Sequence, residues 1–325
     1  MKAMIYKEYG NPDVFQLAEI ERPVPKKDEV LVKVHATTVT TADVRLRSLN
    51  VPSGFGVMVR LFQGLTKPRK QLLGSDFSGV VEEIGGNVKD FQIGDRVFGS
   101  SKSGTYAEYT VIKEKNCISK IPDNLSFEQA VALPFGAMTS LTFIRDLGKL
   151  KEGQTILING ASGSLGTNAI QLAKYYGAKV TAVCSRKNIE LVKSLGADEA
   201  IDYNKGDFRN SGKKYDIIYD TLGLISPKES LIMLNDGGHH LMAVASIPQY
   251  FDIFKLSLIQ KKKINAGMAI FDKKNIETVA ELVEQGILNP VVDKTFDLEN
   301  ISEAHRYVDL GHKVGNVVIN IENSN

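Results

Sequence analysis

"TILINGASGSLGTNAIQLAKYYGAKVTAVCSRK" runs from Thr155 to Lys187 and decides the fold. It begins with an apolar run, turns at glycines, continues as an amphipathic segment and ends in a second apolar run. Short apolar runs of this kind are typical of buried parallel strands, and the segment between them has helical periodicity. The stretch therefore predicts a strand, turn, helix and strand within a doubly wound α/β domain.

The turn contains three glycines, Gly160, Gly163 and Gly166, in a relaxed form of the GxGxxG spacing. Small residues at such a turn let the backbone approach a pyrophosphate, and the helix that follows supplies free N–H groups and a favourable dipole. Glycines also end strands and start helices for purely structural reasons. The position between a predicted strand and a predicted helix favours dinucleotide binding.

The end of the second apolar run indicates which dinucleotide binds. An NAD site normally has Asp or Glu about twenty residues beyond the glycines, whereas this chain has Ser185, Arg186 and Lys187. A guanidinium, an ammonium and a hydroxyl suit a 2′-phosphate, so the sequence predicts NADPH. The alternative is that Arg186 and Lys187 are solvated residues at a helix start. Tyr203, after the third strand, either flanks the same phosphate or caps a strand.

Composition excludes several classes of function. The 325 residues are 43% hydrophobic and 24% charged, and the net charge of +2 gives no reason to expect nucleic acid or a membrane surface as partner. Cys117 and Cys184 lie far apart, which suggests neither a disulfide framework nor a cysteine zinc site. No stretch resembles a signal peptide or a membrane span, so we expect a cytoplasmic protein.

The first third of the chain has the pattern of a β-rich domain. Short runs rich in Val, Ile, Tyr and Thr occupy 14–21, 29–39, 76–85 and 105–112, with Pro, Gly, Asn and Asp between them. A short helix is predicted over 41–49, with Thr41 as its N-cap. From 126 to 147 the pattern becomes helical, and Pro134 should kink or split this helix.

Strands and helices then alternate through the middle of the chain. Apolar strand candidates lie at 155–160, 179–185, 199–203, 215–223 and 239–246, with helices over 164–177, 187–197 and 227–235 between the successive strands. The last part has an amphipathic helix over 273–286, a strand near 292–299, a further helix and a terminal strand at 316–321. The middle therefore predicts a parallel sheet covered by helices on both faces.

Several motifs spread along the chain resemble the medium-chain dehydrogenase/reductase superfamily, and most closely its quinone oxidoreductase-like, zinc-independent branch. They are the glycine turn together with "GDRVFG" at Gly94–Gly99, "GTYAEY" at Gly104–Tyr109, "ALPFGAMTSL" at Ala132–Leu141 and "LVKSLGADEAIDY" at Leu191–Tyr203. The resemblance implies a GroES-like β-rich catalytic domain over 1–122 and 268–325. It also implies an inserted Rossmann domain over 123–267, with the active site between the two.

The residue types at the zinc-ligand places of the resembled family do not favour a catalytic metal. Zinc members of the superfamily have a catalytic Cys, then Gly-His-Glu, then a lobe of four cysteines. This chain has Thr40 or its neighbour at the first place, Gly74-Ser75-Asp76 at the second, and no cysteine lobe. Thr, Ser and a single Asp do not make a zinc site, and the five histidines are scattered. We expect hydride transfer from NADPH to a quinone or another α,β-unsaturated carbonyl acceptor without a metal.

The resemblance also suggests where the substrate binds. Thr40, Thr41 and Asp43 are the residues that line the substrate cleft in the family, and we take them as the candidate catalytic residues. Thr40 stands where many quinone reductases have Asn, and Arg45 replaces a family Tyr, which leaves the choice of substrate open. The alternative is that the two threonines belong to a strand and Asp43 to a helix start.

Other cofactor contacts are implied by the resemblance alone. A Gly-Lys pair often precedes the last strand in the family; here it is Gly315-Asn316, so a phosphate contact of that lysine is lost and Asn316 offers at most a hydrogen bond. The positions that match the family's cofactor contacts lie after Leu133-Pro134, in the glycine turn and at a strand end: Thr139, Asn159, Gly160, Ala161, Ser162, Gly163, Ser164, Leu165, Ala243, Ala245 and Ser246.

Two other functions remain open at this point. One is a protein that binds NADPH as a sensor or structural component without turnover. The other is reduction of an enoyl thioester, for which the basic stretch Val59–Gln71 would face a charged carrier. The natural acceptor, the proton donor and the path of residues 50–71 are not determined by the sequence. It does not decide the oligomeric state either, and a homodimer is one of the states it allows.

Overall fold

The middle of the chain forms a parallel sheet, as predicted, and it has six strands where five were expected. The computed structural model describes residues 1–101, 104–257 and 263–321, and it orders this sheet β10-β9-β8-β11-β12-β13. The helices α5 (Ser164–Tyr175), α6 (Ile189–Ser194) and α7 (Pro227–Met233) connect its strands. The strands are β8 (Thr155–Asn159), β9 (Lys179–Cys184), β10 (Glu199–Asp202), β11 (Tyr215–Asp220), β12 (Leu234–Met242) and β13 (Lys263–Ala266).

Both faces of this sheet are covered, which explains its continuous apolar strands. In β8, Ile156 and Ile158 belong to the core formed with α5 and α4 (Pro134–Leu141), whereas Leu157 packs on the other face with Met233 of α7. Adjacent side chains of a strand point to opposite faces, so an apolar run buries both. The carboxyl ends of these parallel strands meet at one edge of the sheet, and the glycine turn follows β8 at that edge.

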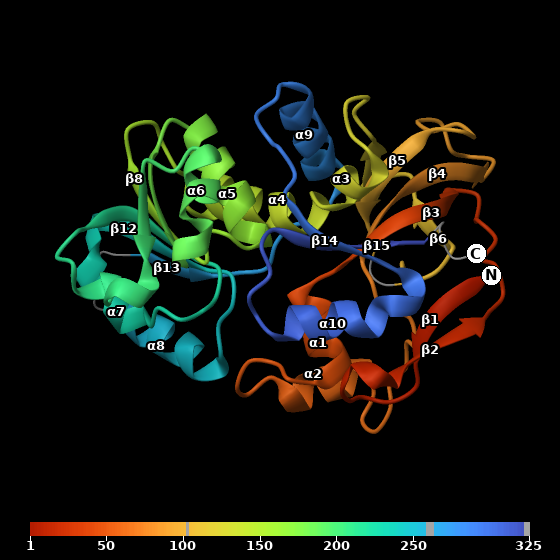
Figure 1. Ribbon diagram of the computed structural model, residues 1–325, viewed down its shortest axis with the longest axis horizontal. Coiled ribbons are helices and arrows are strands. Elements are labelled where there is room, and N and C mark those ends of the chain that lie inside the picture. The colour runs from red at the N-terminus through yellow and green to blue at the C-terminus, as the bar shows by residue number, and fades with distance from the viewer. Residues whose placement is uncertain (102–103, 258–262, 322–325) are drawn as a thin grey trace.

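A second, mostly antiparallel sheet is built from both ends of the chain. Its order is β14-β15-β3-β4-β5-β7, with β6 also paired to β3, and β1 and β2 form a separate pair. It lies beside the parallel sheet (Figure 1). The strands are β1 (Lys2–Tyr6), β2 (Phe15–Glu19), β3 (Glu29–Val39), β4 (Asp76–Ile84), β5 (Arg96–Ser100), β6 (Tyr109–Lys113), β7 (Ile118–Lys120), β14 (Val292–Asp297) and β15 (Asn316–Asn320).

Two helix predictions are tested directly. Pro134 splits the helical segment as expected: α3 (Phe127–Val131) ends before it, and α4 starts at Pro134. The predicted N-cap of the first helix is wrong by one residue. Thr40, not Thr41, caps α1 (Thr41–Ser48), because its side chain accepts a hydrogen bond from the backbone N–H of Asp43.

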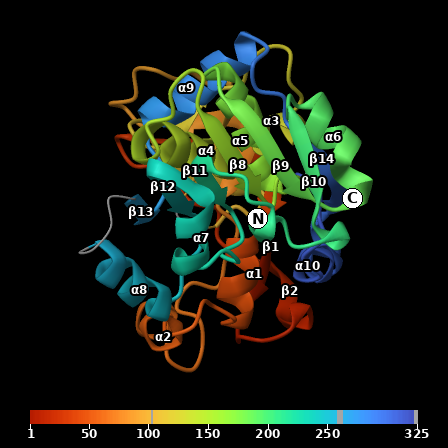
Figure 2. The same cartoon turned by 90° about the vertical axis from the view of Figure 1, so that its left-hand side faces the viewer.

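The remaining helices lie around the boundary between the two sheets. Helices α9 (Lys273–Glu284) and α10 (Ile301–Asp309) come from the C-terminal part of the chain. The stretch 50–71 contains α2 (Gly56–Gln63), which lies near α8 (Ile247–Ser257) (Figure 2). The rings of Phe55 and Tyr250 meet edge to face between these helices, with centroids 6.2 Å apart. No helix among the described residues is long and apolar enough to cross a membrane.

Candidate functional site

The three glycines of the turn have different reasons to be glycine. Gly160 has φ +76°, and a Cβ on it would lie 2.4 Å from Thr221 Oγ1. A Cβ on Gly166 would lie 2.3 Å from the carbonyl oxygen of Gly160. Gly163 has an ordinary φ of −82°, and a Cβ there would meet only the Gly160 carbonyl, at 3.5 Å. The fold therefore requires Gly160 and Gly166, while Gly163 keeps open the space before the N-terminus of α5, as a pyrophosphate would need.

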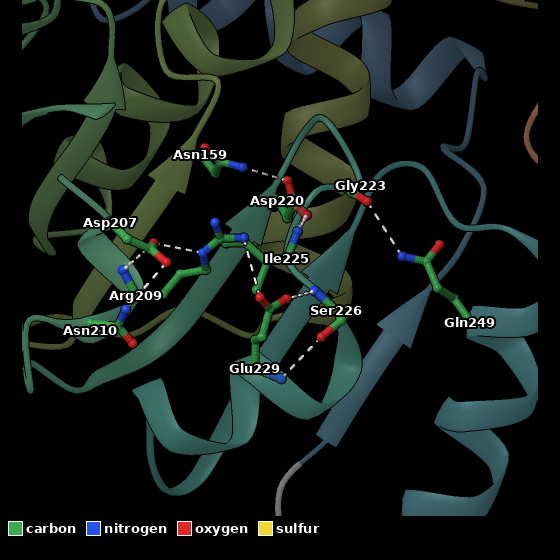
Figure 3. Close-up of polar contacts among 10 residues, drawn as sticks. All are labelled: Asn159, Asp207, Arg209, Asn210, Asp220, Gly223, Ile225, Ser226, Glu229 and Gln249. Carbon is green, nitrogen blue, oxygen red and sulfur yellow. Dashed lines mark hydrogen bonds and ion pairs between the residues drawn. The ribbon is translucent and has the colours of Figure 1, made fainter. Parts of the chain in front are cut away.

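The strand next to the turn ends in a buried carboxylate that organises the following loop. Asp220, fully buried at the end of β11, accepts hydrogen bonds from Asn159 Nδ2 at 2.9 Å and from the Ile225 N–H at 2.7 Å (Figure 3). It also accepts one from the Leu222 N–H at 3.1 Å. Burial raises the pKa of Asp220, and these hydrogen bonds oppose that rise. Asn159 is thus held in place by Asp220, a residue that the sequence analysis did not single out.

The loop before the last strand passes over the glycine turn. The Gly315 N–H donates to the Ser162 carbonyl at 2.8 Å, and the Ser164 hydroxyl donates to Asn316 Oδ1 at 2.6 Å. The Asn316 amide also donates to the Val291 carbonyl at 3.1 Å. Asn316, predicted as a cofactor contact, therefore has both ends of its amide engaged within the protein. Its contact with a cofactor stays a prediction.

A cavity beside the turn contains most of the residues predicted to hold the adenosine half of the cofactor. Ser185, Lys187 and Tyr203 line it, whereas Arg186 is exposed and does not. Lys313 and His312 close it from the loop before β15, and none of its described lining residues is acidic. The remaining lining residues are Asn159, Gly160, Ser162, Gly163, Val183, Cys184, Asn188, Leu222 and Gly311.

Lys313 was missed by the sequence analysis, although it lies three residues before the expected lysine position at 316. It lines both this cavity and the adjoining one on the substrate side. Its ammonium donates to the Gly315 carbonyl at 2.6 Å, next to the glycine turn. Burial lowers the pKa of Lys313 to about 8, against the opposing effect of the Asp293 carboxylate. The Lys313 ammonium therefore lies beside the turn, in the same loop as position 316, where the family often has its lysine.

The second cavity, on the substrate side, brings the two parts of the chain together. It has a volume of about 310 Å³ and is lined by Thr40 and Thr41 on one side and by Gly160 and Gly163 on the other. We call it the cleft. Its other lining residues are Val39, Val44, Arg45, Ser48, Asn50, Phe135, Ser164, Leu165, Thr221, Leu222, Val308, Asp309, Gly311, Lys313 and Asn316.

Asp43 does not line the cleft. It is 4% exposed, and its carboxylate accepts hydrogen bonds from the Thr40 hydroxyl at 2.5 Å, the Thr40 N–H at 2.9 Å and the Gly74 N–H at 3.2 Å. These contacts form a capping box at the start of α1. Burial raises the pKa of Asp43, and the hydrogen bonds oppose the rise. The structure thus gives Asp43 a role in holding Thr40.

Ala161, also a predicted contact, is fully buried in the core and lines none of these cavities. Other predicted contacts fall at two further places. Thr139, on α4, is 6% exposed, and its hydroxyl has no hydrogen-bond partner within the described chain. Ala243 and Ala245 follow β12 directly, and Ser246 lines a polar hollow next to the cleft. An unpaired buried hydroxyl is costly, so Thr139 is suited to a polar ligand atom.

Comparisons with known proteins identify the family. Two family models match: the alcohol dehydrogenase GroES-like domain over residues 26–123 and the zinc-binding dehydrogenase over residues 195–319. The mitochondrial NAD(P)H oxidoreductase RTN4IP1 of Mus musculus is 32% identical, over 99% of this chain and 89% of its own. The chain belongs to the medium-chain dehydrogenase/reductase superfamily. Within it, the relatives place the chain in the quinone oxidoreductase-like branch.

Two more members of the superfamily are similar to this chain. The chloroplastic NADPH-dependent alkenal/one oxidoreductase of Arabidopsis thaliana is 32% identical, over 98% of this chain and 79% of its own. The structure of the quinone oxidoreductase from Coxiella burnetii has a TM-score of 0.87 at 29% identity and covers 99% of each chain. The protein is therefore an oxidoreductase that uses a nicotinamide cofactor.

The residues present do not fit the zinc that one family description names. Thr40 or its neighbour, and Ser75, stand where the resemblance places zinc ligands. Asp76 is buried and hydrogen-bonded to Thr38 and Ser100. Within residues 1–101, 104–257 and 263–321, no group of three or more His, Cys, Asp or Glu side chains could hold a metal ion. Zinc requires such a group of ligands.

Proposed function

We propose that the protein transfers hydride from NADPH to a quinone or another α,β-unsaturated carbonyl compound without a metal ion. The observation that carries this proposal is the cleft, in which Gly160 and Gly163 of the dinucleotide turn face Thr40 and Thr41 across one cavity. A cofactor on the turn and an acceptor beside the threonines would share that space. The acceptors are those named for the related quinone and alkenal/one oxidoreductases.

The preference for NADPH over NADH rests on the cavity beside the turn. Lys187 and Ser185 line it together with Tyr203 and His312, and its described lining contains no carboxylate that would repel a 2′-phosphate. Lys313, on the opposite wall, and the free N–H groups at the start of α5 would face the pyrophosphate. Thr139 would meet the nicotinamide end.

The cofactor and the protein would contribute different parts of the reaction. When bound, NADPH would supply a hydride to the acceptor's conjugated carbon, with the negative charge on the carbonyl oxygen and a proton from water completing the reduction, at oxygen for a quinone and at the α carbon for an enone. The Thr41 hydroxyl is exposed at the cleft and free to donate to that oxygen, whereas the Thr40 hydroxyl donates to Asp43. Thr41 is therefore the candidate oxyanion donor, and Thr40 and Asp43 position it.

Loss of NADPH absorbance tests this proposal. Purified protein is exhaustively chelated and then supplied with NADPH and either 9,10-phenanthrenequinone or 1,4-benzoquinone, against an enzyme-free blank. Turnover should exceed the blank and survive chelation. Turnover that requires stoichiometric zinc would disprove the metal-free mechanism. Cofactor binding without turnover for any acceptor would instead support the NADPH-binding sensor.

The cellular location and the oligomeric state of the protein stay predictions. The mitochondrial and chloroplastic names of the relatives leave the predicted cytoplasmic location open. Enoyl-thioester reduction also remains an alternative, because α2 presents Arg60 at the surface within the basic stretch.

A further inference from the structure

Arg45 is a charged residue of the cleft that the proposed chemistry does not use. It lies on α1, is half-buried, and lines both the cleft and the polar hollow beside it. Among the described residues its guanidinium has no hydrogen-bond or ion-pair partner. Burial lowers the pKa of Arg45, and no charged neighbour adds to or offsets that effect. Half-buried guanidinium groups are normally paired, so this one is available to a ligand.

The charges around Arg45 leave the space positive. Asp309 is the acidic residue among the described lining of the cleft, and it forms an ion pair with Arg47 at 2.7 Å. Lys313 adds a second cation to the cleft. The described lining of the hollow contains no acid and comprises Arg45, Asn50, Val51, Pro52, Ser53, Gly223, Val244, Ser246 and Gln249.

A helix N-terminus adds to this positive environment. Ser246 and Gln249, at the start of α8, both line the hollow. The Ser246 N–H and hydroxyl donate to Gln249 Oε1 at 2.7 and 3.0 Å. Gln249 Nε2 donates to the Gly223 carbonyl (Figure 3). These contacts fix the first turn of the 11-residue helix α8 against the hollow. The positive end of the helix dipole therefore lies on the same side as the Arg45 guanidinium.

We propose that Arg45 binds an anionic substituent of the acceptor, so that the natural substrate is an α,β-unsaturated carbonyl compound or quinone bearing a carboxylate or a similar anion. The reacting part occupies the cleft, and the anion extends toward the hollow. This inference rests on the proposed function and names its substrate class. A planar guanidinium can bind a carboxylate through two parallel hydrogen bonds, which an ordinary neutral acceptor would leave unused.

Two other roles for Arg45 make different predictions. If its guanidinium stabilised the developing oxyanion, every acceptor would depend on it equally. If it bound a cofactor phosphate, the affinity for NADPH would depend on it and the choice of acceptor would not. A pair of acceptors that share one enone, one with a charged carboxylate and one without, separates these roles when each is compared between the wild type and an Arg45 variant.

The experiment compares (E)-4-oxo-4-phenylbut-2-enoic acid with its methyl ester. Both carry the same enone, and only the acid is anionic at neutral pH. The ratio of kcat/KM for the acid to that for the ester should be about tenfold or more higher in the wild-type protein than in Arg45→Gln, the scale of one charge-assisted hydrogen-bonded contact. Arg45→Gln should abolish this preference by raising KM for the acid. The kcat/KM for the ester and the NADPH dissociation constant should be unchanged. Arg45→Lys should keep part of the preference.

Arg60→Gln is the matched control. Arg60 is an exposed cation on the neighbouring helix α2 and donates to the Leu65 carbonyl outside the cleft. Its removal changes the net charge by the same amount as Arg45→Gln. The preference for the acid should be unchanged in this variant, because surface charge alone is screened by salt.

Three results would overturn the inference. Equal losses of turnover for acid and ester in Arg45→Gln would assign Arg45 to the oxyanion. A weaker NADPH complex with unchanged acceptor preference would assign it to the cofactor. The third result is a kcat/KM for the acid, and for the ester, that is unchanged in Arg45→Gln.

A binding measurement separates this inference from the proposed function. If neither acceptor turns over, calorimetry measures how the saturated acid, 4-oxo-4-phenylbutanoate, binds to the protein with NADP⁺. Binding to the wild type that is lost in Arg45→Gln supports the anion site although the proposed function fails. Equal binding to both proteins, or none to either, contradicts the anion site.

Discussion

The Thr40 hydroxyl donates a 2.5 Å hydrogen bond to Asp43 Oδ2, and the pair caps the N-terminus of α1. Because of this contact, the hydroxyl groups of the two cleft threonines have different hydrogen-bonding states. Thr40 is 6% exposed and committed to Asp43, whereas Thr41 is exposed and begins the helix. The hydroxyl that is free to serve an acceptor is therefore that of Thr41.

Valine substitutions distinguish the two roles. Thr41→Val should lower single-turnover NADPH oxidation about 100-fold, the scale seen when one oxyanion donor is removed, and should leave stability unchanged. Thr40→Val removes the N-cap and should lower the free energy of unfolding by about 1–2 kcal/mol, measured in urea. The NADPH dissociation constant should be unchanged in both valine variants. Rates within twofold of wild type in Thr41→Val would mean that positioning alone carries catalysis.

Gly163 and Gly166 provide a matched pair for the cofactor site. Gly163→Val adds a side chain into open space before α5, so the protein should fold while NADPH binding falls below detection by fluorescence titration. Gly166→Ala forces a Cβ to within 2.3 Å of the Gly160 carbonyl and should destabilise the fold. Normal NADPH affinity in a folded Gly163→Val protein would place the pyrophosphate elsewhere.

The choice between NADPH and NADH should depend on Lys187 more than on Arg186. Only Lys187 lines the cavity beside the turn. Lys187→Ala should raise the NADPH dissociation constant about tenfold and change that for NADH little, since one charged hydrogen bond is lost. Arg186→Ala serves as the control, with a smaller effect. Tighter binding of NADH than NADPH by the wild type would contradict this interpretation of the strand end.

Lys313 predicts a pH dependence of pyrophosphate binding. Its pKa of about 8 lies below the ordinary lysine value, and a bound pyrophosphate would favour its protonated form. The dissociation constant of ADP-ribose, which lacks a 2′-phosphate, should therefore be lowest below pH 8 and rise as the pH increases through that value. Lys187 and His312 line the same cavity as Lys313, and the Asp293 carboxylate acts on the Lys313 ammonium from outside that lining.

Lys313→Met should bind ADP-ribose more weakly below pH 8 and lose the rise above it. Isothermal titration in two buffers of different ionisation enthalpy also reports the proton uptake. The same pH dependence in wild type and variant would mean that another group titrates.

The strand, turn and helix around Gly160 could be predicted because their pattern is local. Apolar runs, glycine spacing and a Ser-Arg-Lys strand end are all visible within 33 residues, and the structure confirms the parallel sheet that they predict. The sequence contains less information about the positions of single side chains. The residues Thr40 and Asp43 show the S/T-x-x-D/E spacing of a capping box, which would have corrected the N-cap and favoured the helix-start alternative for Asp43.

Lys313 and Arg45 could not be placed from the sequence. Lys313 reaches the glycine turn through a loop about 150 residues farther along the chain, and sequence spacing does not report such contacts. Arg45 is visible as a substitution for a family tyrosine, but its lack of a partner depends on every element around the cleft. Its role becomes apparent only when both cavities are known.

The most direct test of the central claim follows the hydride itself. Metal-depleted protein is supplied with NADPH deuterated at C4, each epimer in turn, and with the methyl ester of (E)-4-oxo-4-phenylbut-2-enoic acid as acceptor. The account predicts that one epimer transfers deuterium to the carbon β to the ketone, while the proton on the α carbon comes from solvent. Bound NADPH with no deuterium in the product, or with no product from this or any quinone acceptor, would contradict it.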